Sequence, residues 1–83
     1  MRMNDRLLGC APGERVIVTA IEAAPARIDR LAALGILPGV ELRVQQTRPV
    51  VVVGCDETVL AIERDIASEI RVTAATEGEA FAT

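Results

Sequence analysis

The chain has 83 residues, 51% of them hydrophobic and only one of them aromatic, and it carries a formal net charge of -3. A chain of this length forms one domain with a modest core. All nine positive charges are arginines without a basic run, which argues against nucleic-acid binding because such binding needs clustered cations. No apolar stretch approaches the ~20 residues that span a bilayer, and the first residues do not begin a secretion signal. We therefore expect a cytoplasmic protein without direct membrane insertion.

Composition divides the chain into three segments. We expect a flexible N-terminus over residues 1–6 and a single folded domain over residues 7–73. Residues 74–83 are rich in Ala, Thr, Gly and Glu and lack any apolar periodicity, which predicts a flexible C-terminal tail.

The first element of the domain is expected to be a strand over Glu14–Ile21. Val16, Val18 and Ala20 would face the same side, because successive side chains of a strand point to opposite faces. Pro12-Gly13 precedes this strand and fits a turn, in which glycine accepts a backbone conformation that other residues avoid.

A short helix is expected next, ending at a glycine. Pro25 suits a first helical position, where its missing N–H would have no partner. Three apolar residues fall three apart on one helical face, namely Ile28, Leu31 and Leu34. Gly35 follows as the residue that closes the helix in a left-handed conformation.

A second turn and strand follow the helix. Pro38-Gly39 fits the centre of a type II turn, and the apolar residues after it alternate with polar ones over 40–45, which predicts a half-buried strand. The pattern echoes Pro12-Gly13, because in both places apolar residues lie three and five positions after the glycine. A turn of this kind fixes which face of the following strand points inward.

The remaining elements are short. Val50–Gly54 and Thr58–Ile62 are expected to form a hairpin around a short turn that contains Gly and Asp. A helix is expected over Arg64–Ile70 and a last edge strand over Arg71–Thr73. Short strands, tight turns and two short helices predict an all-β fold, a small barrel of about five strands with one helix after the first strand and one before the last.

This order of motifs resembles the FeoA family of small ferrous-iron-transport accessory proteins. The similarity rests first on the pattern Arg30-Leu31, Leu34-Gly35-Ile36 and Pro38-Gly39 with the alternating residues behind it. Matching positions elsewhere are Leu8, Gly13, Val16 and Val18 at the start and Leu60-Ala61-Ile62, Ala67, Ile70 and Val72 at the end. The resemblance covers roughly Leu7 to Val72 and implies an SH3-like barrel.

The resemblance also implies a function and a partner. A family member would be a cytoplasmic accessory or regulatory protein of bacterial ferrous iron uptake that docks on FeoB, the membrane transporter with a GTPase domain. Docking would recruit it to the inner face of the membrane. One position departs from the family, because Glu63 stands where members commonly carry arginine, which would reverse the charge of a partner contact there.

The residues offer little chemistry. The chain has no His, Lys, Tyr or Trp and a single serine, Ser68, so triads that depend on histidine are impossible. Cys10 and Cys55 are read as reduced apolar residues, and only the fold could bring them together. Asp56-Glu57 supplies too few oxygens for a dedicated cation site. We expect no enzymatic activity, no cofactor and no high-affinity metal site.

Two features are candidates for partner binding. Ile36 and Leu37 lie between the expected helix end and the expected turn. Either both have only a structural role in this connection, or one of them projects as an apolar anchor for a partner, with Leu37 the first choice. Val50 and Val52 belong to a run of four valines that is either buried on both faces or presents an apolar outer face to a partner or a second copy. Structural roles in turns and caps are assigned to Gly13, Gly35, Pro38 and Gly39.

Two other functions compete with the accessory role. The same domain resembles the C-terminal domain of metal-dependent repressors, so the chain could be a free-standing regulatory or ligand-sensing module. The third alternative is a homo-oligomeric structural module without a dedicated partner. A peptide-binding SH3 domain is disfavoured, since its groove is lined by aromatic residues and the one aromatic here, Phe81, lies in the expected tail.

Overall fold

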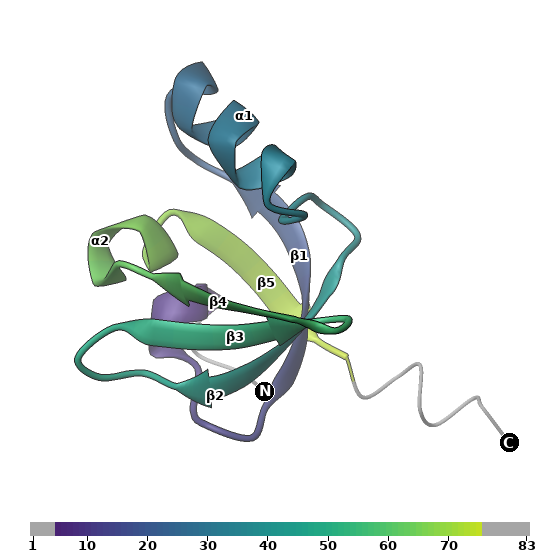
Figure 1. The fold of residues 1–83 in the computed structure, drawn as a ribbon, viewed down its shortest axis with the longest axis vertical. Coiled ribbons are helices and arrows are strands. Elements are labelled where there is room, and N and C mark those ends of the chain that lie inside the picture. The colour runs from purple at the N-terminus through teal and green to yellow at the C-terminus, as the bar shows by residue number, and fades with distance from the viewer. Residues whose placement is uncertain (1–4, 76–83) are drawn as a thin grey trace, which may run out of the picture.

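The computed structural model describes residues 5–75, which form a single five-stranded antiparallel sheet curled around a core, with three short helical segments (Figure 1). The strand order is β4-β3-β2-β1-β5. The elements in chain order are the 3-10 helix η1 (Leu7–Gly9), β1 (Arg15–Ile21), α1 (Pro25–Ala33), β2 (Glu41–Gln46), β3 (Val51–Cys55), β4 (Thr58–Ile62), α2 (Arg64–Ala67) and β5 (Ile70–Ala74). The expected barrel of about five strands with two inserted helices is confirmed.

Alternating aliphatic side chains fill the core. Each strand sends every second residue inward, and these residues are almost all valine, leucine or isoleucine. The residues that are less than 2% exposed include Leu7, Val16, Val18, Ile36, Leu42, Val51, Val53 and Ile70. No buried side chain among the described residues is polar or charged, so the side-chain core is held by apolar packing while backbone ladders join the strands.

The two Pro-Gly turns are built alike. Gly13 and Gly39 both have φ of +96°, and each glycine N–H donates to a carbonyl on the partner strand. Gly13 donates to Val44 and Gly39 to Val18, at 2.7 Å in each case. Each acceptor lies five residues after the other glycine, so β1 and β2 are related by a local twofold pattern. The echo in the sequence therefore corresponds to a repeated geometry.

Several element boundaries differ from the sequence prediction. β1 pairs with β5 through a register shift between Val18 and Ala20, which leaves Ala20 half-buried instead of fully inward. The second helix spans only Arg64–Ala67, and Ile70 belongs to β5 instead. The reason is that Ile70 pairs with Ile21 of β1, and ladder hydrogen bonds outweigh the weak helical pattern of so short a segment.

Both ends of the domain extend beyond residues 7–73. The carbonyl of Asp5 accepts a hydrogen bond from the N–H of Val72 at 2.8 Å, and Arg6 forms a bridge with Arg71. At the other end, β5 runs to Ala74, and Ala75 is buried. The rest of the expected flexible segments, residues 1–4 and 76–83, lies outside the described residues.

Candidate functional site

The connection between α1 and β2 carries the first candidate residues. Gly35 has φ of +95°, and its N–H donates to the Ala32 carbonyl at 2.9 Å, which closes the helix in the manner expected of glycine. The N–H of Ile36 donates to the Leu31 carbonyl, also at 2.9 Å. This closure directs Ile36 into the core, where it is 0% exposed. Ile36 therefore cannot serve as a surface anchor, because the helix cap fixes its direction.

Leu37 points the other way. Its side chain is 43% exposed, and its carbonyl accepts a hydrogen bond from the Val40 N–H at 3.1 Å across the Pro38-Gly39 turn. With Ile36 held inward and the turn closed behind it, Leu37 has a fixed backbone and a solvent-facing side chain. It remains the candidate anchor.

Two further exposed apolar residues were missed by sequence reasoning. Leu34 is 54% exposed and Val59 is 62% exposed. The helical stripe assigned Leu34 to the buried face, but α1 projects from one end of the sheet and only Leu31 of that helix is buried (Figure 1). For Val59 the signal was available, because alternation along β4 that sends Ile62 inward places Val59 on the opposite face.

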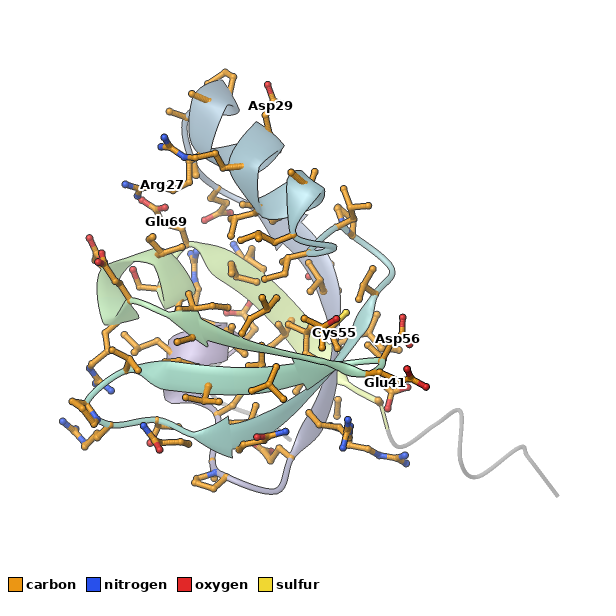
Figure 2. The ribbon with its side chains drawn as sticks, viewed as in Figure 1. Arg27, Asp29, Glu41, Cys55, Asp56 and Glu69 are labelled. Carbon is orange, nitrogen blue, oxygen red and sulfur yellow. The ribbon has the colours of Figure 1, made fainter. Side chains whose placement is uncertain are left out.

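The Leu37 connection lies beside the end of β3. The Cys55 thiol is 3.9 Å from the Gly35 carbonyl, and a Cβ added at Gly35 would lie 4.0 Å from the same sulfur atom. Figure 2 shows Cys55 between α1 and the β3–β4 turn that carries Asp56. Cys10 is also buried, and its thiol is 3.5 Å from the Arg6 carbonyl.

The valine candidates lie at the other end of β3. Val51 and Val53 are buried, whereas Val50 and Val52 are half-buried, so the run alternates as a strand with one inward face. Val50 is separated from Cys55 by the length of β3, about 17 Å at ~3.3 Å per residue. The structure therefore does not gather the two candidate pairs into one site.

A pair of opposite charges ties α1 to the rest of the fold. The Arg27 guanidinium lies 2.9 Å from a carboxylate oxygen of Glu69, which precedes β5 (Figure 2). The hydrogen bond to Glu69 raises the pKa of Arg27 above its ordinary value. Both side chains are about one-third exposed, so the pair positions the helix more than it stabilises the protein.

A second charge network joins the N-terminal residues to β5. Arg71 lies 2.9 Å from Glu22 and also contacts the Asp5 carboxylate, while Arg6 lies 2.5 Å from Glu22. The hydrogen bond from Arg71 lowers the pKa of both carboxyls, and Arg6 contributes further at Glu22. Each of these four side chains forms an ion pair with at least one of the others, so we assign the network a structural role.

A shallow depression of about 250 Å³ has charged walls. It is lined by Arg15, Glu41, Arg43, Gly54 and Asp56. Arg15 lies 3.6 Å from Glu41, and the Arg43 guanidinium donates to the Asp56 carbonyl at 3.3 Å. Arg15 thus forms an ion pair with Glu41, whereas Arg43 contacts the main chain of Asp56 and not its carboxylate.

Residues 5–75 contain no group of three or more His, Cys, Asp or Glu side chains that could hold a metal ion. None of the described helices is long and apolar enough to cross a bilayer.

The five-stranded sheet with its inserted helices defines a small SH3-like module, and this module carries exposed apolar residues at the α1–β2 connection. The family model described as the FeoA domain matches residues 6–74 of the chain. The chain therefore belongs to the FeoA family.

Solved structures agree with this assignment. The FeoA protein from Chlorobium tepidum is 32% identical with a TM-score of 0.78, over 84% of this chain and 70% of that one. A crystal structure of an iron uptake regulatory protein (FeoA) shares 22% identity and a TM-score of 0.76 over 82% and 92% of the two chains. No curated protein sequence matches the chain.

The fold also occurs inside longer regulators. IdeR from T. acidophilum is 27% identical with a TM-score of 0.77, and the match covers 83% of this chain but 33% of that one. A manganese-dependent transcriptional repressor gives 26% identity and the same TM-score, over 83% and 40% of the two chains. The chain thus matches a segment that makes up 33% of the first repressor's length and 40% of the second's.

Proposed function

We propose that this protein is an accessory factor of bacterial ferrous iron uptake that acts by docking on a FeoB-type transporter through the α1–β2 connection. Membership of the FeoA family supports the pathway. The single observation that supports the docking site is Leu37, a large apolar side chain that is 43% exposed on a backbone fixed by a cap and a turn.

A fixed backbone makes Leu37 a favourable anchor. Binding energy concentrates in a few apolar residues near the centre of an interface, and ordering a mobile loop would oppose binding. Here the hydrogen bond between Val40 and Leu37 and the burial of Ile36 already order the connection. Leu34, which is 54% exposed and three residues earlier in the chain, extends the apolar surface beside it.

The test replaces the anchor by a charge. Leu37→Glu should keep its free energy of unfolding within about 0.5 kcal/mol of the wild type, because surface changes are usually that small. It should nevertheless fail to retain the cytosolic part of the cognate transporter in a pull-down and fail to restore ferrous iron uptake in cells lacking the native protein. Thr73→Glu, which adds the same charge at an exposed position of β5, should behave as wild type in all three assays.

Two results would contradict this proposal. If Leu37→Glu unfolds, as Ile36→Glu is expected to, then Leu37 belongs to the core. If Leu37→Glu folds and restores uptake fully, the α1–β2 connection is not the docking surface, and Val50 and Val52 become the next residues to test.

A regulatory or ligand-sensing role is the second candidate, supported by the similarity to IdeR and the manganese-dependent repressor. A sensor must bind its ligand, whereas a docking factor need not. If the pull-down on the transporter fails for the wild type while a divalent cation binds stoichiometrically, this second role is favoured.

A further inference from the structure

The two edges of the sheet are treated differently. The β5 edge is covered, because Asp5 accepts a hydrogen bond from Val72 and Arg6 forms a bridge with Arg71. Within residues 5–75, nothing pairs with β4 on the side away from β3. Edge strands are commonly protected by charges, proline or bulges, but Thr58–Ile62 contains no charged residue and no proline and pairs with β3 without a register shift.

The backbone groups open to a partner belong to Val59 and Ala61. The two-residue turn at 56–57 makes Cys55 and Thr58 a hydrogen-bonded pair, and bonded and non-bonded pairs alternate along an antiparallel ladder. Val59 and Ala61 therefore direct their N–H and C=O groups away from β3. Their side chains are exposed as well, Val59 to 62%.

Carboxylates stand at both ends of this edge. Asp56-Glu57 precedes β4, Glu63 and Asp65 follow it, and all four side chains are exposed. In the described part of the chain none of them forms an ion pair within 4.0 Å. Arg64, which lies between the last two, is held by the Thr47 carbonyl at 2.5 Å. The edge is thus apolar in the middle and acidic at its ends.

This charge pattern argues against a second copy as the occupant. An antiparallel pairing of two β4 strands would place Asp56-Glu57 of one copy beside Glu63 and Asp65 of the other, and a parallel pairing would place each acidic end beside itself. Like charges across a strand pair are destabilising. The chain's own residues 76–83 carry two glutamates and no basic residue, so they are equally mismatched.

We propose that the β4 edge binds an extended segment of another protein by strand addition, and that this segment is apolar in its centre and basic at both ends. Main-chain hydrogen bonds would supply the affinity, and the flanking carboxylates would select the partner. The six residue steps from Glu57 to Glu63 span about 20 Å in an extended chain, which sets the separation of the two basic ends. This proposal uses residues other than Leu37 and does not depend on the transporter.

A designed peptide tests the proposal. The probe is a fluorescein-labelled peptide of alternating Val and Thr flanked by lysines, and its matched control carries glutamates at the same places. We expect the lysine peptide to bind at low ionic strength, with amide chemical shifts changing at Val59 and Ala61. The glutamate peptide should bind on the order of tenfold more weakly.

Two variants locate the site. Ala61→Lys adds a positive charge to the open edge and should weaken binding of the lysine peptide by on the order of tenfold. Natural edge strands are protected against pairing by charged residues in the same way. Thr73→Lys adds the same charge on β5 and should leave binding unchanged. Thermal melts check that both variants fold, and Val59→Lys replaces Ala61→Lys if that variant does not.

Three outcomes would overturn the proposal. They are equal binding of the two peptides, unchanged binding to the β4 variant, and shift changes confined to the α1–β2 connection. Self-association of the wild type that the Ala61→Lys substitution abolishes would assign the edge to a second copy instead. A failure here leaves the Leu37 experiment unaffected, since that assay tests other residues.

Discussion

Two glycines in this protein would respond to an added side chain in physically different ways. At Gly39, φ is +96° and a Cβ would meet no atom within 4 Å, so the only cost of a side chain is backbone strain. At Gly54, a Cβ would lie 2.8 Å from Gln45 and 2.9 Å from Arg43 side-chain atoms, but these atoms are the ends of flexible side chains that can move aside. A substitution at Gly39 therefore measures the cost of backbone strain at positive φ without a steric clash.

We expect Gly39→Val to lower the free energy of unfolding by about 1–3 kcal/mol, because a β-branched residue is strained at positive φ. Gly39→Asn should recover part of the loss, since asparagine tolerates that region better. Chemical denaturation with an unchanged m-value measures both variants. Equal midpoints for wild type and Gly39→Val would contradict a strained turn.

The side-chain inventory also predicts a weak affinity for iron. The sequence has no histidine, and residues 5–75 hold no cluster of metal-binding side chains. Calorimetric titration of the reduced protein with Fe²⁺ under anaerobic conditions should therefore be flat. A stoichiometric micromolar isotherm would show that ligands gather in a way these residues do not indicate.

At the scale of elements, α1 depends on a small number of contacts. It projects from one end of the sheet (Figure 1). Only Leu31 of its nine residues is buried, and Arg27 contacts Glu69. A helix of this length is marginal by itself in water, so these contacts determine whether it forms. The adjoining connection carries Leu37, which links the order of α1 to the proposed docking surface.

Leu31→Ala should therefore lower the free energy of unfolding by about 2–4 kcal/mol, through lost burial and the cavity that remains. Glu69→Gln should cost much less than Leu31→Ala, because its partner Arg27 is partly exposed to solvent. Hydrogen exchange should accelerate in α1 before β2 in both variants. Uniform acceleration across the whole sheet would mean that α1 and the barrel unfold as one unit.

At the scale of the whole molecule, one charge network holds the two ends of the domain together. Arg71 of β5 contacts both Asp5 and Glu22, and Arg6 contacts Glu22 from the N-terminal side. The same N-terminal residues cover the β5 edge, which leaves β4 as the open one. The network therefore decides which edge of the sheet can meet another chain.

Acid should weaken this network. The pKa of Asp5 and that of Glu22 are lowered in the folded state, chiefly by hydrogen bonds from Arg71. Groups whose pKa is lowered stabilise the fold fully above their unfolded pKa, about 4, and lose that contribution as the pH falls through the folded value. Thermal midpoints of the wild type should therefore fall below pH about 4. Glu22→Gln should flatten this fall, whereas Asp29→Asn, at an exposed site on α1, should not.

Local chemistry in the sequence determined most of the architecture. The strands and their inward faces were predicted from two Pro-Gly turns and from aliphatic alternation. The first helix was predicted from Pro25 at its start and Gly35 at its end. These signals are local, because turn geometry and the two-residue period of a strand act over a few neighbouring residues. The same local rules led to Leu37 as an exposed residue.

Tertiary structure decided the rest, for reasons that no local pattern contains. Leu34 is exposed because α1 projects beyond the sheet, and Ile70 joins β5 because Ile21 offers it a ladder partner. Asp5 is fixed by Val72, a residue far along the chain. Whether an apolar or charged side chain is buried, paired or left open at a sheet edge depends on what the fold places beside it, and that is a property of long-range packing.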